Sequence, residues 1–117
     1  MNINTFEELK TACQSQNKSI WEIAQENEAL KNEISIEDLR KIVKKNIDAM
    51  REAIQTGLKS EQKSFSGMSG GDCKKLQNRY LKTPSLLGTI FEKITTYALA
   101  TSEENARMGK IVACPTP

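Results

Sequence analysis

The sequence predicts an all-α protein, a bundle of about five helices with a Gly/Ser-rich loop before the fourth. Aromatic residues make up only 5% of the chain and charged residues 27%. This balance favours helices over a β-sandwich or barrel. In the clearest stretch, apolar residues also recur every three or four positions, which is the period of a helix face. The 117 residues suffice for one modest domain.

Three helices are expected within residues 1–57. The first two have recognisable starts, because Thr5 is followed three positions later by Glu8, and Ser19 by Glu22. This pairing is the signature of a capping box, in which each side chain bonds to the backbone of the other residue. A short polar segment links the two helices.

The third helix is the clearest of the five. Ser35 opens it, with Asp38 three residues later as a shorter variant of the capping box, and Gly57 is expected to be its C-cap. Its apolar stripe keeps helical spacing over five turns. The stripe consists of Ile36, Leu39, Val43, Ile47, Met50 and Ile54.

Residues 58–71 interrupt the helical pattern and form the Gly/Ser-rich loop, and two helices are expected in residues 72–109. The first includes Cys73 and stops at Pro84, since proline cannot continue a helix. Ser85 then caps a long helix that runs towards Met108.

The long helix is expected to end at Gly109, and its apolar arc over residues 86–108 is broad. Such an arc is typical of a helix at the centre of a bundle, and it also indicates a surface that binds a partner. The tail, residues 110–117, is apolar and non-helical, and the chain then stops. We therefore expect the 117 residues to be a piece of a longer protein.

Composition excludes several classes of function. The chain has no histidine, which removes Ser–His and Cys–His catalysis, histidine metal sites and imidazole bases. A net charge of +2 without an arginine cluster or an aromatic platform argues against nucleic acid. No apolar run approaches the roughly 20 residues of a membrane span. An odd number of cysteines and no signal peptide predict reduced thiols in a cytoplasmic protein.

The best candidate site is the segment of residues 66–75. Its Gly70–Gly71 pair leads into a helix N-terminus, where free N–H groups and the positive end of the helix dipole attract an anion. Lys74 and Lys75 add positive charge, so a small carboxylate or phosphate would fit. The alternative is that Asp72 caps the helix and the glycines form only a flexible turn. Spacing alone does not decide between the two.

The cysteines are expected to pack in the core and not to bind metal. Cys13, Cys73 and Cys114 lie too far apart for a zinc knuckle or a local cluster motif. Cys73 shares the apolar stripe of its helix, and Cys13 follows an apolar position on a short helix.

A polar cluster follows the apolar part of the long helix. It is interpreted as solvated surface, although Asn105, one turn before the terminating glycine, could face a site. The cluster comprises Glu103, Glu104, Asn105 and Arg107.

Three segments, in order and at familiar separations, are similar to one protein family. They are MREAIQTGL at 50–58, SGGDCKKL at 69–76 and ENARMGKIVACPTP at 104–117. Together they resemble the alpha chain, or alpha domain, of iron–sulfur-dependent L-serine dehydratase (L-serine ammonia-lyase). The resemblance covers residues 36–117 and is vaguer over 1–35.

The resemblance implies an N-terminal piece of a lyase subunit that converts L-serine to pyruvate and ammonia. The family uses an open iron of a [4Fe–4S] cluster as Lewis acid, and its cluster cysteines come later in the chain. The piece would therefore be inactive alone. Expected partners are a beta chain or beta domain and a small amino-acid substrate, within an oligomer. The substrate-binding residues implied are Ser69, Gly70, Gly71, Asp72, Lys74 and Thr116.

Two alternatives stay open at this point. A related cluster-dependent lyase could act on cysteine or threonine, because nothing in these residues separates the substrates. From a different class, the chain could be a non-catalytic helical interaction module whose lysines and apolar stripe dock a partner.

Overall fold

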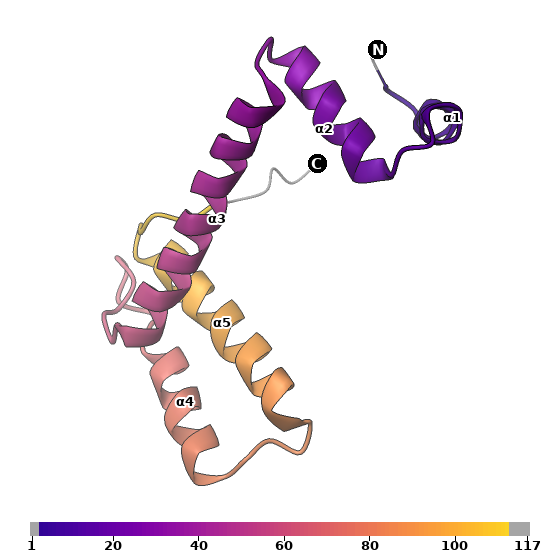
Figure 1. The fold of residues 1–117 in the computed structure, drawn as a ribbon. Helices are drawn as coiled ribbons and strands as arrows, with labels where there is room; N and C mark the ends of the chain where they lie inside the picture. The colour runs from indigo at the N-terminus through magenta and orange to yellow at the C-terminus, as the bar shows by residue number, and fades with distance from the viewer. Residues whose placement is uncertain (1–2, 113–117) are drawn as a thin grey trace. The chain divides into compact units, whose positions relative to one another are not determined.

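The structure, a computed structural model, describes residues 3–112 and contains in them five α-helices and no strand (Figure 1). The all-α class and the number of helices are confirmed. The helices are α1 (Phe6–Gln16), α2 (Ile20–Lys31), α3 (Ile36–Lys59), α4 (Asp72–Lys82) and α5 (Gly88–Ala106). The chain divides within α3 into two compact units, Met1–Lys45 and Asn46–Pro117.

In the first unit, α1 and α2 pack against each other, and both predicted capping boxes form. The Glu8 N–H donates to Thr5 Oγ1 at 3.3 Å, and the Thr5 N–H donates to the Glu8 carboxylate at 3.1 Å. At α2, the N–H of Ser19 donates to the Glu22 carboxylate at 2.9 Å. The small core of this unit includes Ile23, which is 3% exposed. The local sequence patterns therefore predict the starts of α1 and α2 correctly.

Helix α3 begins as predicted. The Asp38 N–H donates to Ser35 Oγ at 3.0 Å, and the serine hydroxyl donates back to the carboxylate at 2.8 Å. Its predicted apolar stripe is largely exposed: Ile47 and Met50 are each 41% exposed. The residues that α3 buries are the smaller ones beside the stripe, Ala49, Ala53 and Gly57.

The prediction that Gly57 caps α3 is wrong. The helix continues for two more residues, to Lys59, and Gly57 is buried inside it. A Cβ at Gly57 would overlap the backbone of Ala100 in α5. The glycine thus permits a close approach of two helices within the second unit and does not terminate one of them.

Helices α4 and α5 lie side by side in the second unit (Figure 1). Helix α4 ends at Lys82, just before Pro84, as predicted. The prediction that Ser85 caps α5 is wrong, because the helix starts only at Gly88 with Leu87 as its N-cap. The hydroxyl of Ser85 instead accepts the Leu87 N–H at 3.1 Å, in the turn before the helix.

Helix α5 ends at Ala106, three residues before the predicted Gly109. Met108 has a positive φ of 63° and is followed by Gly109, whose N–H donates to the carbonyl of Glu104 at 2.9 Å. The Met108 N–H donates to the Asn105 carbonyl at 3.0 Å. This pair of bonds is a Schellman motif, with methionine at the left-handed position where glycine is usual.

The broad apolar arc of α5 does not occupy a central place in the described structure. Ile90 is 75% exposed and Ile94 61% exposed, whereas Thr96 and Ala100 on the opposite face are buried. The apolar arc is therefore a free surface of the described residues, and a partner for it stays a prediction. None of the described helices is long and apolar enough to cross a membrane.

Candidate functional site

The Gly/Ser-rich loop folds back on itself before α4. The Ser64 N–H donates to the carbonyl of Ser69 at 2.7 Å, and the Ser69 N–H donates to Ser64 Oγ at 3.2 Å. Gly70 follows with a φ of 121°, and a Cβ there would lie 2.6 Å from the carbonyl oxygen of Gln62. Gly70 is thus required both for its backbone conformation and for its contact with the preceding segment.

Helix α4 begins directly after this turn, and its N-cap is Gly71, with a φ of 83°. Asp72 is the first residue of the helix and not its cap. Its carboxylate instead accepts a hydrogen bond from Lys75 Nζ at 3.0 Å. The alternative in which Asp72 caps α4 is therefore wrong.

The side chain that caps α4 comes from α5. Glu103 Oε1 accepts the N–H of Asp72 at 2.7 Å and the N–H of Cys73 at 2.9 Å. The Glu103 side chain is only 5% exposed. Two of the N–H groups that the sequence offered to an anionic ligand thus already bind a carboxylate of the protein itself.

Arg107 joins Glu103 to a second buried carboxylate and to the loop. Its Nη2 lies 2.9 Å from Glu104 Oε2, its Nη1 lies 3.7 Å from Glu103 Oε2, and Nη1 also donates to the Gln62 carbonyl at 3.2 Å. The arginine side chain is 6% exposed. The interpretation of this cluster as solvated surface is wrong for both glutamates and for the arginine side chain, although Asn105 is exposed.

The sequence contains a signal for the pairing within this cluster, though not for its burial. Arg107 follows the two glutamates at four and three positions, the spacing at which side chains on one helix face can pair. Paired charges of this kind are common on exposed helix surfaces, so the spacing alone could not indicate burial. What the sequence lacks is any sign that α5 meets the start of α4 here.

A hollow of about 300 Å³ lies beside the glycine turn. Three lysine side chains and one glutamate line it, so its charge is positive. Within the part of the chain that the structure describes, Lys74 forms no ion pair, which leaves its ammonium group available to an anion. The charged and glycine residues of the lining are Glu61, Lys63, Gly70, Gly71, Lys74 and Lys75.

The structure brings together some of the predicted site residues. Gly70, Gly71 and Lys74 line the hollow, and Asp72 follows them at the start of α4. Ser69 is exposed in the adjoining loop. The predicted site residue Thr116 lies outside the described residues.

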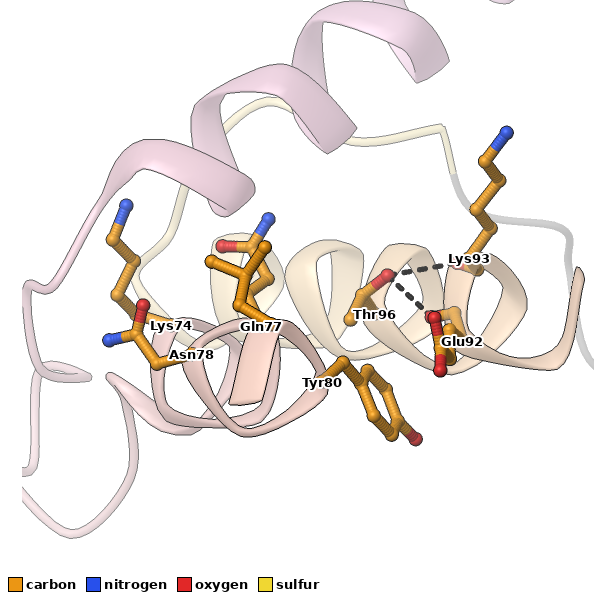
Figure 2. A pocket seen from close by; sticks show the side chains of 8 residues that line it. Lys74, Gln77, Asn78, Tyr80, Glu92, Lys93 and Thr96 are labelled. Atoms are coloured by element: carbon orange, nitrogen blue, oxygen red, sulfur yellow. Dashed lines mark hydrogen bonds between the residues drawn. The ribbon is translucent and has the colours of Figure 1, made fainter. Parts of the chain in front are cut away.

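A second hollow, of about 340 Å³, lies between α4 and α5 and was not foreseen from the sequence. Figure 2 shows Lys74 on α4 and Lys93 on α5 among its lining side chains. The Thr96 hydroxyl donates to the Glu92 carbonyl at 2.7 Å and so bonds within its own helix. Lys74 and Asn78 line both hollows, so the two hollows adjoin along α4.

Cys73 is a core residue, as predicted. It is fully buried, and its thiol donates a hydrogen bond to the Thr96 carbonyl, with Sγ 3.4 Å from the oxygen. Burial, assisted by the negative charge of Glu103, raises the pKa of the Cys73 thiol above its usual value. A thiol held in its protonated form is a poor metal ligand. Cys13 is half-buried in the other unit, and Cys114 lies outside the described residues.

The described residues do not fit an iron–sulfur cluster. Over residues 3–112, no group of three or more cysteine, aspartate or glutamate side chains is arranged to hold a metal ion. Such a cluster needs several cysteine thiolates close together. The expectation that these residues include no metal ligands stays a prediction for the chain as a whole.

Comparison with known proteins gives one family and two similar proteins. The family model described as "Serine dehydratase alpha chain" matches residues 15–117. The L-serine dehydratase alpha chain of Peptoniphilus asaccharolyticus is 30% identical over 114 residues, which are 97% of this chain and 39% of the relative. The probable L-serine dehydratase alpha chain of Bacillus subtilis (strain 168) is 39% identical over 94 residues, 80% of this chain and 30% of the relative.

The chain therefore spans between 30% and 39% of the length of these two relatives. No solved structure matches it significantly.

Proposed function

Because this chain belongs to the serine dehydratase alpha chain family, we propose that it is part of a lyase that deaminates L-serine to pyruvate and ammonia. The names of both relatives support this activity. The family match covers all three segments in which the sequence resembles the family. As the chain covers well under half of either relative, the activity is proposed for the whole enzyme, and these residues alone are expected to be inactive.

The observation that carries the proposed site is the positive hollow at the glycine turn. We assign to it the carboxylate of the substrate, with Lys74 as its principal counter-ion. Gly71 has no side chain, so a small ligand can approach the backbone closely there, whereas Gly70 lets the preceding segment pack against the turn. Ser69 and Thr116 complete the proposed set of substrate-binding residues, and Asp72 positions Lys75 through their 3.0 Å ion pair.

A [4Fe–4S] cluster is proposed for the whole enzyme, with its ligands outside these residues. The support is the family membership together with the misfit of the described cysteines, since Cys73 is buried and protonated. What this chain contributes is binding and orientation: it holds the carboxylate end of the substrate. A beta chain or beta domain as partner, an oligomeric assembly and a cytoplasmic location are part of the same proposal.

The test is a substitution in the full-length enzyme, assembled with its beta portion and cluster. Lys74→Ala is expected to raise KM for L-serine about tenfold, the loss of roughly 1.4 kcal/mol from one partly exposed charge pair. Pyruvate formation measures it. Lys93→Ala is the matched control, since Lys93 lines only the second hollow. An unchanged KM for Lys74→Ala, or an equal rise for Lys93→Ala, overturns the assignment.

A further inference from the structure

The carboxylate of Glu103 holds the start of α4 from a distance of about thirty residues along the chain. A single oxygen, Oε1, accepts the N–H groups of Asp72 and Cys73 at 2.7 and 2.9 Å. Neither Gly71 nor Asp72 caps these N–H groups with its own side chain. Gly71 has no side chain, and the Asp72 carboxylate bonds to Lys75. The N-terminus of α4 therefore depends on α5 for its cap.

The same end of α5 also holds the segment on the other side of the turn. Arg107 donates to the carbonyl of Gln62 at 3.2 Å, and Gly70 packs closely against that carbonyl. Both chain segments that border the positive hollow are thus bound to a single helical turn. A shift of this turn would move the lysines that line the hollow.

Burial makes the Glu103 contact strong and specific. Hydrogen bonds to a charged acceptor are roughly twice as strong as neutral ones, and a carboxylate at a helix N-terminus is also stabilised by the helix dipole. The second oxygen, Oε2, is buried without a hydrogen-bond partner among the described residues and lies 3.7 Å from Arg107 Nη1. Glu103 therefore holds the start of α4 through Oε1 alone.

We propose that Glu103 is a positioning residue, which fixes the Gly70–Lys74 turn so that Lys74 faces the hollow. By occupying the N–H groups of Asp72 and Cys73, it also leaves an incoming carboxylate to the lysine ammonium groups and not to the helix N-terminus. This inference rests on the proposed function, because it assumes that the hollow takes the substrate carboxylate.

The experiment uses the full-length enzyme with its beta portion and cluster, and two measurements on each variant. Hydrogen exchange followed by mass spectrometry reports on the amides of residues 69–76, and steady-state kinetics give KM and kcat for L-serine. The variants are Glu103→Ala, which removes the acceptor, and Glu103→Gln, which keeps an acceptor oxygen without the charge. Glu92→Gln is the matched control, because Glu92 accepts the Ser85 N–H at 2.6 Å near the opposite end of α5.

We expect Glu103→Ala to speed exchange in residues 69–76 by about tenfold to a hundredfold, the loss of charge-assisted hydrogen bonds. KM is expected to rise about tenfold with a much smaller change in kcat, the mark of lost ground-state binding. Glu103→Gln should lie between Glu103→Ala and the unmodified enzyme in both measurements. Glu92→Gln should leave residues 69–76 unchanged.

Unchanged exchange in residues 69–76 for both Glu103 variants overturns the inference, and so does a Glu103→Gln variant as impaired as Glu103→Ala. If Glu103→Ala does not fold, the comparison of Glu103→Gln with Glu92→Gln decides in the same way. Faster exchange with an unchanged KM supports the positioning of the turn but refutes the substrate site. The two failures are therefore distinguishable.

Discussion

Replacing Gly57 by alanine is expected to destabilise the second unit, although alanine is the better helix former. In an isolated helix the substitution would gain about 1 kcal/mol. Here the new Cβ would lie 2.6 Å from the carbonyl carbon and 2.9 Å from the Cα of Ala100. Ordinary carbon contacts are about 3.5–4.0 Å, so α3 and α5 would have to separate by about 1 Å.

The atoms in the way belong to backbone, which cannot rotate aside as a side chain can. Overpacking of this kind costs about 1–3 kcal/mol and occasionally more. Because the contact is with backbone, the overpacking cost lies at or above the upper end of this range. After the gain in helix propensity is subtracted, the net loss in free energy of unfolding is about 2 kcal/mol.

Urea unfolding followed by circular dichroism measures this loss as a lower midpoint. Thr56→Ala, at an exposed position one residue earlier in α3, is the control and should be neutral or slightly stabilising. A Gly57→Ala variant as stable as Thr56→Ala would refute the close helix approach, because helix propensity would then be the only effect left.

Two further substitutions test local features of the helix ends. Met108→Gly should raise the free energy of unfolding by about 0.5 kcal/mol, because glycine adopts the left-handed conformation without strain and the exposed methionine side chain has little packing to lose. Thermal unfolding measures this gain, and a gain as large in Met108→Ala would contradict the reason given. The N–H groups of Asn4 and then Thr5 lower the pKa of Glu8 below its usual 4.5, so the carboxylate stabilises the fold above about pH 4.5 and this contribution is lost as the pH falls through the lowered pKa. Urea midpoints from pH 6 to pH 3 should therefore show that the advantage of the unmodified chain over Glu8→Gln shrinks as the pH falls; an advantage of the same size at both ends of this range would contradict the assignment.

The helices could be predicted because their signals are local. A capping box joins residues three positions apart, so Thr5 with Glu8 and Ser19 with Glu22 need no knowledge of the rest of the chain. The period of the α3 stripe is local in the same sense. The predicted end of α5 at Gly109 is wrong, because Met108 adopts the left-handed conformation one residue earlier.

The role of Gly57 and the burial of Glu103 could not be predicted, because both depend on contacts between distant segments. Gly57 meets Ala100, and Glu103 meets the start of α4. A glycine near the end of a helix is most often a cap, and a glutamate near an arginine is most often exposed. For the candidate site, the sequence indicated the glycine turn and Lys74, but it did not indicate that a carboxylate of the protein already occupies the helix N-terminus.

The buried cluster at the end of α5 also limits how this part of the chain can change during evolution. Arg107 serves two carboxylates at once, Glu103 and Glu104, and each of the three side chains is almost entirely out of water. Loss of the arginine alone would leave two negative charges buried without a counter-ion, at a cost of several kcal/mol. Loss of Glu104 would free the arginine to pair fully with Glu103, which still caps α4. Substitutions should therefore enter this cluster in an order, with Glu104 replaced before the arginine, and lineages that reverse that order should be rare.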